Sequence, residues 1–410
     1  MLGFPTAALL ACLAGQFDVN VAVTAEGRAG EGPLAADATI RKGVIGILMP
    51  DLQLAYLSRV SDVRLDYVAR IFWRTPNDLG TNKPLILHSV NLVGTSQVTG
   101  RLQLSATANM SVGESDYTAL TLVLPNQPAL PSVADFFSLT AAAGAVESLS
   151  RTAKVGLNLS YINRTPLGAT AEVMAAPGMI VPPFPHQNTF GAEPNFRLTL
   201  SRIDELVFSG LVSYGTYTGG VDILLAAPQL KWQRHLSRQF ILHLIGGLAY
   251  VHVEPTLDAR TPVAPIAEIG LDMDLDHRRG VVTRASTAAR VDYFVDPVLG
   301  TAGPRLLLTL SWSSTLNPNW LVGIDATYST VFVATTPLFL GTTPIDETMA
   351  AVSLPVRYRA SDNLFTEFGV RWSDRAPSLE VSAFGFHQRQ LWLYVALTAT
   401  TRRPVSRMVQ

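Results

Sequence analysis

One pattern repeats along this chain: ten to fourteen residues of alternating polar and apolar side chains, then a turn, and then the pattern again. In the segment 62–74, for example, Val63 and Leu65 alternate with Arg64 and Asp66. Successive side chains of a strand point to opposite faces, whereas a helix would scatter the same residues around its circumference. The alternation therefore predicts strands throughout.

The number and length of these segments constrain the fold further. Strands of soluble sandwiches and propellers, the alternative all-β folds, average about five or six residues. Most segments here are long enough to cross a bilayer at a tilt of about 45°. We count about eighteen of them, near 16–28, 50–59, 62–74, 85–96, 100–112, 136–148, 151–164, 195–203, 205–217, 221–234, 238–252, 266–276, 281–296, 303–315, 319–332, 347–360, 364–375 and 389–400.

The connectors alternate between short and long, which is typical of bacterial outer-membrane barrels with short periplasmic turns and longer extracellular loops. An even strand count places both termini at the short-turn side, and only the link Thr218–Gly220 departs from the rule. We therefore predict an all-β fold: a single transmembrane antiparallel β-barrel of about eighteen strands. The short turns are Ser58–Asp62, Ser201–Asp204, His235–Arg238, His277–Gly280, Leu316–Pro318 and Ser361–Asn363, and the long links include 29–49, 113–135, 165–194 and 376–388.

Composition supports a barrel in lipid. Apolar residues make up 48% of the chain and charged residues 15%, yet no apolar run approaches the roughly 20 residues of a spanning helix. Strands can face lipid only in a closed barrel, where every backbone N–H and C=O is paired. We expect Val63, Leu65, Tyr67, Leu102, Leu104, Leu271, Met273, Leu306, Leu308 and Val370 to face lipid, and Arg64, Asp66, Gln103, Asp272, Asp274, Arg305 and Arg371 to face the lumen.

The ends of the chain carry separate expectations. Residues 1–15 resemble a signal peptide, in which Cys12 suggests lipoprotein processing as the alternative to ordinary cleavage. The barrel is expected over 16–402, followed by a C-terminal periplasmic tail, 403–410. The Pro-rich link Ala175–His186 is a candidate plug that folds into the lumen.

Motifs of catalysis and cofactor binding were not found. The net charge of −1 gives no general attraction to nucleic acid. The seven histidines form no HExxH motif, and there is no GxSxG, P-loop or GxGxxG. The acids of Asp272–Asp276 form a ladder on one strand face, which favours a lumen lining over a metal site. We therefore expect no enzyme activity, no cofactor and no metal, although a barrel hydrolase needs too few residues to be visible here.

Function must then reside in the lumen lining, whose charges mix both signs. Such charges can pair across strands to hold the wall, or form a hydrated surface over which a long polar polymer slides. A strongly ion-selective pore would carry one sign in excess. The candidate contacts are Arg64, Asp66, Arg70, Arg74, Lys154, Asp272, Asp274, Arg284, Arg290, Asp292, Asp325, Arg357, Arg359, Glu367 and Arg371.

Short motifs resemble a known family. The segments Leu54–Tyr56, Val63–Tyr67, Gly113–Tyr117, Arg371–Pro377 and Phe386–Trp392 look like those of the integral outer-membrane barrels of Wzx/Wzy-type exopolysaccharide export pathways. The resemblance implies a conduit for polysaccharide in the cell outer membrane, acting with a periplasmic polysaccharide export protein. The alternatives are a general porin or small-solute channel, a structural or adhesin-like barrel, and a barrel enzyme.

Overall fold

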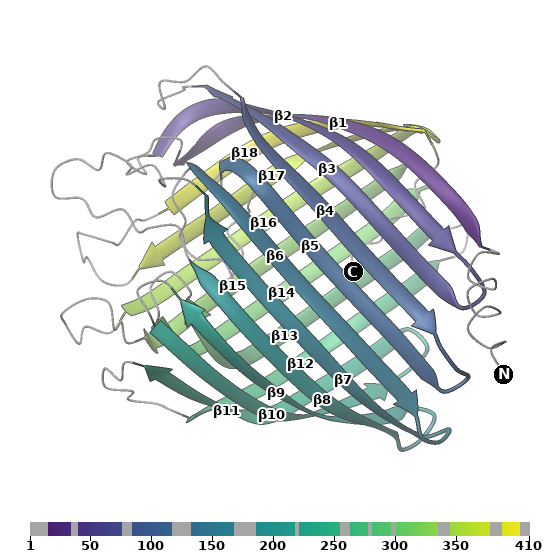
Figure 1. Cartoon of the computed structure of the whole chain (residues 1–410). Coiled ribbons are helices and arrows are strands. Elements are labelled where there is room, and N and C mark those ends of the chain that lie inside the picture. The colour runs from purple at the N-terminus through teal and green to yellow at the C-terminus, as the bar shows by residue number, and fades with distance from the viewer. Residues whose placement is uncertain are drawn as a thin grey trace, which may run out of the picture.

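The protein forms one closed barrel of antiparallel strands (Figure 1). The computed structural model describes residues 15–33, 40–75, 84–116, 133–167, 186–217, 221–254, 263–277, 281–296, 301–334, 345–377 and 388–401. Its 18-stranded sheet joins each strand to the next along the chain, and β1 (Gln16–Pro33) pairs with both β2 (Ile40–Leu57) and β18 (Gln388–Thr400). The predicted barrel, its strand number and its antiparallel order are confirmed.

The strands extend to the predicted lengths and beyond. The other strands are β3 Ser61–Thr75, β4 Leu85–Gln97, β5 Leu102–Asp116, β6 Val133–Ser148, β7 Ala153–Pro166, β8 Gln187–Thr199, β9 Asp204–Tyr217, β10 Val221–His235, β11 Phe240–Glu254, β12 Val263–His277, β13 Val281–Asp296, β14 Thr301–Asn317, β15 Trp320–Ala334, β16 Ile345–Ser361 and β17 Leu364–Pro377.

Connections at the two rims differ in length, because successive strands are separated by only a few residues at one rim and mostly by more residues at the other. We call these ends the short-turn rim and the long-link rim. The described chain starts and finishes at the short-turn rim, because β1 begins there and β18 ends there. The signal-peptide interpretation of 1–15 falls on residues outside the described ranges except for Gly15, and the tail 403–410 lies outside them entirely. Of the candidate plug, only His186 is described.

Two predicted links were too long. Most of 29–49 is strand, since β1 continues to Pro33 and β2 starts at Ile40. In 165–194, β8 starts at Gln187, and the predicted strand 195–203 runs into the following turn. Glycine and proline in these stretches indicated loops, but here they lie within strands. In 29–49 the glycines of β1 make room for packing against Trp392. In 165–194 the pairing of β8 with β9 is interrupted locally at Pro194.

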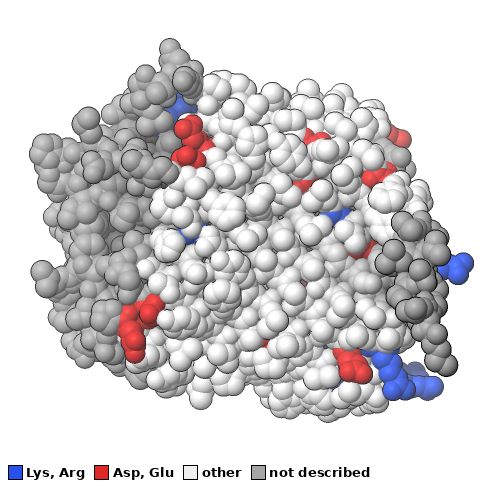
Figure 2. Space-filling model, in the orientation of Figure 1, with Lys and Arg blue, Asp and Glu red and all other residues white. Residues whose placement is uncertain are grey.

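The alternation sorts side chains into an outer and an inner set on every strand. On β18, Leu391, Leu393, Val395 and Leu397 are exposed, whereas the intervening Trp392 is buried. On the face seen in Figure 2, the outer surface is largely uncharged across the middle of the barrel, with charged residues chiefly toward the rims. Because the backbone groups of this apolar wall are paired by the closed sheet, it suits the hydrocarbon core of a membrane.

Aromatic residues of the outer set pack in pairs across neighbouring strands. At the short-turn rim Phe17 lies 4.9 Å from Tyr56, and Trp320 lies 4.7 Å from Tyr358, measured between ring centroids. Aromatic girdles of this kind mark the two membrane–water interfaces of transmembrane barrels. No helix among the described residues is long and apolar enough to cross a membrane.

Candidate functional site: the barrel lumen

The inward side chains are buried in one half of the barrel and more exposed in the other. On β4, Leu85, Leu87 and Ser89 near the long-link rim are buried, Asn91 is half-buried, and Gln97 near the short-turn rim is exposed. The inward side chains of β8, β10, β12, β16 and β18 follow the same gradient. Water therefore reaches the lumen side chains of the short-turn half, which we call the vestibule, and is largely excluded from those of the long-link half, which we call the packed half.

An apolar cluster lies inside the packed half, which the expectation of a wholly polar lumen did not foresee. It comprises Ile45 and Ile47 of β2, Phe72 of β3, Leu85 and Leu87 of β4, Phe136 of β6 and Trp392 of β18. These residues share the inward face with charged neighbours, since Ile47 is paired with Glu26. Burying apolar side chains inside the barrel is favourable, because it removes them from the water of the lumen.

Glycines make this cluster possible. A Cβ on Gly32 would lie 2.8 Å from the Trp392 ring, and one on Gly30 would overlap the backbone of Leu391. The indole therefore lies over Gly32 of β1, in one buried cluster with Ile45 and Ile47 of β2. Gly113 of β5, with φ of 125°, leaves an empty inward position through which Phe136 and Leu87 meet. A Cβ there would meet the Ile86 carbonyl oxygen at 2.3 Å.

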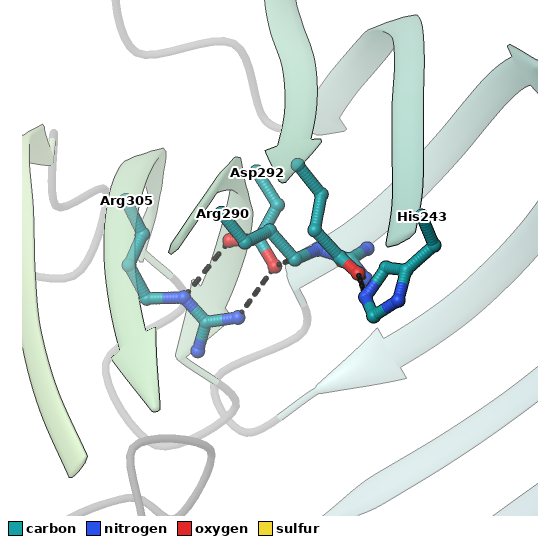
Figure 3. Close-up of polar contacts among 5 residues, drawn as sticks. His243, Arg290, Asp292 and Arg305 are labelled. Carbon is teal, nitrogen blue, oxygen red and sulfur yellow. Dashed lines mark hydrogen bonds and ion pairs between the residues drawn. The ribbon is translucent and has the colours of Figure 1, made fainter. Parts of the chain in front are cut away.

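A chain of charged side chains follows the opposite wall across β11 to β14. His243 Nε2 lies 3.1 Å from Glu268 Oε1, and Arg290 Nη1 donates to Glu268 Oε2 at 3.2 Å. Figure 3 shows Asp292 between Arg290 and Arg305. Arg305 donates twice to Asp292, at 2.9 Å from Nε and 2.7 Å from Nη2.

The position of His243 depends on Gly270, because a Cβ there would lie 2.0 Å from its Nε2. The missing side chain lets the imidazole lie across β12 between Glu268 and Asp272, whose Oδ2 is 3.6 Å from Nδ1. Asp292 and Arg305 at the other end of the chain are both buried. A buried pair of this kind is costly to break, about 3–5 kcal/mol, because the remaining charge is left uncompensated.

A second polar network crosses the place where the barrel closes. Arg371 of β17 donates to Glu26 of β1 at 3.1 Å, passing over Tyr394 of β18, whose ring centroid lies 3.9 Å from the Arg371 guanidinium carbon. The Tyr394 hydroxyl donates to Glu367 at 3.0 Å, and Arg357 donates to the same carboxylate at 2.7 Å. Side chains of β16, β17, β18 and β1 are thus tied together on the inner face.

The vestibule has two kinds of wall. On β12 to β15 it carries carboxylates that accept from serine hydroxyls: Ser286 donates to Asp272 and Ser311 to Asp325, each at 2.7 Å. On β4, β5 and β6 the described inward side chains include no charged group. Hydroxyls and amides line most of this second wall, beside the apolar Val93 and Val146, and we call it the neutral wall; its polar residues include Asn91, Thr95, Gln97, Gln103, Ser105, Thr107, Asn109 and Thr140.

The structure joins some of the fifteen predicted lumen residues and separates others. Asp274 lies 3.5 Å from Arg284, and Arg359 pairs with Asp362 of the following turn. The remaining pairs are Arg290–Asp292, Arg357–Glu367 and Arg371 with Glu26.

The predicted residues of β3 are far from those of β12. Strand β12 is nine positions from β3 in a ring of 18, which puts the two strands on opposite walls. Arg64 pairs instead with Asp62 of its own strand at 2.8 Å. Arg70 and Arg74 lie on the same inward face, as does Asp66, and exposed Lys154 lies on β7 near the short-turn rim.

Sequence reasoning missed several members of these networks: Glu26, His243, Glu268, Trp392 and Tyr394. The alternation along β1, β11 and β12 could have placed Glu26, His243 and Glu268 on the inward face. Trp392 and Tyr394 have the same inward parity as Gln390, but aromatic residues of other strands were expected to face lipid. Among the described residues, no group of three or more His, Cys, Asp or Glu is arranged to hold a metal ion.

No family model matches the chain, and no curated relative matches it either. Among solved structures it is similar to OccAB2 of Acinetobacter baumannii, with a TM-score of 0.47 and 10% identity over 94% of this chain and 98% of that one. It is also similar to the siderophore receptor PirA of Pseudomonas aeruginosa, with a TM-score of 0.45 and 9% identity over 93% of this chain and 80% of that one. For the outer membrane protein OpdK of Pseudomonas aeruginosa the TM-score is 0.44, at 10% identity over 93% and 99%. At these levels the likenesses decide neither substrate nor function.

Proposed function

We propose that this chain is an outer-membrane channel for small hydrophilic solutes, with the vestibule open to the periplasm. The observation that carries the proposal is the burial of inward side chains in the packed half. Side chains that fill part of the lumen narrow it, and we expect the remaining passage to admit solutes of the size of single sugars or amino acids. The mixed charges of the vestibule offer weak, exchangeable contacts, which suit transport better than tight binding.

The test is liposome swelling with the purified chain and neutral sugars of increasing size. We expect swelling with monosaccharides, less with disaccharides and none with dextran. Trimming the apolar cluster with Phe72→Ala and Leu87→Ala should raise the disaccharide rate relative to the monosaccharide rate. The matched control is Ile86→Ala, because Ile86 neighbours Leu87 on β4 but is exposed on the lipid face. Absence of swelling with any sugar would refute a small-solute channel.

The second candidate is the polysaccharide-export conduit that the sequence resemblance implies, with a periplasmic export protein as partner. The neutral wall supports it, because a surface of hydroxyls and amides exchanges hydrogen bonds with a hydroxyl-rich polymer without ionic attachment. Deleting the gene should then abolish surface polysaccharide and leave the uptake of small solutes nearly unchanged. Lost uptake of small solutes with normal surface polymer would favour the small-solute channel.

A further inference from the structure

Five consecutive turns at the short-turn rim each carry one exposed arginine. They connect β2 to β3, β4 to β5, β6 to β7, β8 to β9 and β10 to β11, which are neighbours around half of the barrel. Figure 2 shows basic side chains projecting from this rim, at its right. The residues, which we call the arginine arc, are Arg59, Arg101, Arg151, Arg202 and Arg238.

A serine or threonine hydroxyl fixes the shape of each turn. Ser150 Oγ accepts from the backbone N–H groups of Thr152 and Ala153, at 3.2 and 3.0 Å. The equivalent hydroxyls of Ser58, Thr99, Ser201 and Ser237 accept in the same way. Since the hydroxyl satisfies the turn backbone, the arginine side chain is not needed to close the turn.

The residue before the hydroxyl faces lipid in four of these turns. Val98, Leu149, Leu200 and Leu236 continue the outward parity of their strands and are 54–55% exposed. An exposed apolar side chain at this height marks the edge of the hydrocarbon layer. The arginine follows two or three residues later, so its guanidinium lies where lipid phosphates begin.

Two further described turns show that the arginine is a separate feature. Asn317 caps its turn by accepting from the N–H groups of Asn319 and Trp320, and it follows Leu316, which is 56% exposed. Ser361 accepts from Asn363 in the turn after β16. Neither turn holds an arginine, and the second holds Asp362. In these two described turns the turn shape recurs, and in the first of them the apolar neighbour as well, without an arginine.

We propose that the arginine arc binds the anionic headgroups of phospholipids in the leaflet at the short-turn rim. Among the described contacts none of the five guanidinium groups has an ion-pair partner, so each is available to a phosphate. Guanidinium groups bind phosphate with two parallel hydrogen bonds. Adjacent turns lie about 10 Å apart, two strand spacings, so each arginine can hold its own headgroup.

The experiment is native mass spectrometry of the full chain, purified in neutral detergent and given equal amounts of phosphatidylglycerol and phosphatidylcholine. We expect wild type to retain mostly phosphatidylglycerol, in a ratio that falls as salt rises. Replacing all five arginines with glutamine should bring the ratio to that of the mixture. Single replacements should each lower it by up to about fivefold. The five Arg→Lys replacements are the matched control and should keep most of the preference, because the charge remains.

Two further arms identify the source of the phosphate and the state of the barrel. Soluble glycerol phosphate should not compete, because it lacks acyl chains to place beside Leu149 and its equivalents. Every variant used must still give the heat-modifiable gel band of the folded barrel. Equal retention of both lipids by wild type, or an unchanged preference in the five-glutamine variant, would overturn the proposal. Wild type that retains neither lipid would also count against the proposal, and an acidic protein would then be the remaining candidate to bind the arc.

Discussion

At the scale of the residue, the facing of each side chain follows from its position in the alternation. Leu271 and Asp272 are neighbours on β12, yet the first lies on the outer face with Ile269 and the second accepts a hydrogen bond from Ser286 inside the barrel. The sequence alone predicted these opposite orientations. It could not predict where an apolar residue would face inward, because Trp392 depends on the glycines of a strand more than 350 residues away.

We therefore expect Leu271→Arg to impair membrane assembly far more than Asp272→Arg. An arginine on the lipid face near the membrane centre costs about 2–4 kcal/mol, whereas one in the vestibule remains hydrated. The measurement is the fraction of folded, heat-modifiable barrel formed in lipid vesicles. Equal folded fractions for the two variants would show that the two faces are assigned wrongly.

At the scale of the element, strand positions were predictable where the alternation is unbroken and not where proline or glycine interrupts it. Pro194 lies inside β8, and the pairing of β8 with β9 skips Glu193 and Pro194 before it resumes at Asn195. Pro50 lies in a similar gap between β2 and β3. A proline removes one backbone donor, and these strands tolerate it by a local break in pairing rather than by ending. The sequence pattern cannot distinguish such a gap from a strand end.

The strands that close the barrel yield a prediction of their own. Glu26→Gln removes the buried carboxylate that joins β1 to Arg371 of β17 and that also pairs with Arg28. We expect the folded band to convert to the unfolded one at a lower temperature, with a loss of about 3–5 kcal/mol. Glu205→Gln is the control, because its pair with Arg197 is half exposed and worth less than about 1 kcal/mol. Equal melting of both variants would mean that the Glu26 network does not stabilise the closure.

At the scale of the whole molecule, the division of the lumen into a vestibule and a packed half was not predictable. Alternation gives the face of a residue but not its depth or what packs across the interior. Ser105 and Ser89 both have inward parity and similar chemistry, yet the first is exposed and the second is 9% exposed. The difference arises from residues on other strands, such as Phe136 and Trp392, that fill one end.

This division can be measured with single cysteines in a chain that carries Cys12→Ser. We expect Ser105→Cys and Thr107→Cys to react rapidly with a membrane-impermeant maleimide. Ser89→Cys and Ser373→Cys should react at least tenfold more slowly. A tenfold difference in rate corresponds to about 1.4 kcal/mol of free energy for opening the packed half. Denatured protein should react at one rate at all four positions. Equal rates in the folded state would show that water reaches both halves alike, which would contradict the packed half and the size limit proposed for the channel.

The pairing of β1 with β18 also dictates the order in which the barrel can assemble. Every other pair joins strands adjacent in sequence, whereas the bond between Asn20 and Thr400 spans 380 positions. Bringing such distant ends together costs roughly 5 kcal/mol of chain entropy if nothing between them is yet ordered. A chain that first zips hairpin by hairpin avoids most of this cost, because its two edges are then already held near each other. Closure is accordingly the last step of folding, and until it occurs both terminal strands present unpaired edges to which a second chain, or an assembly factor, can add.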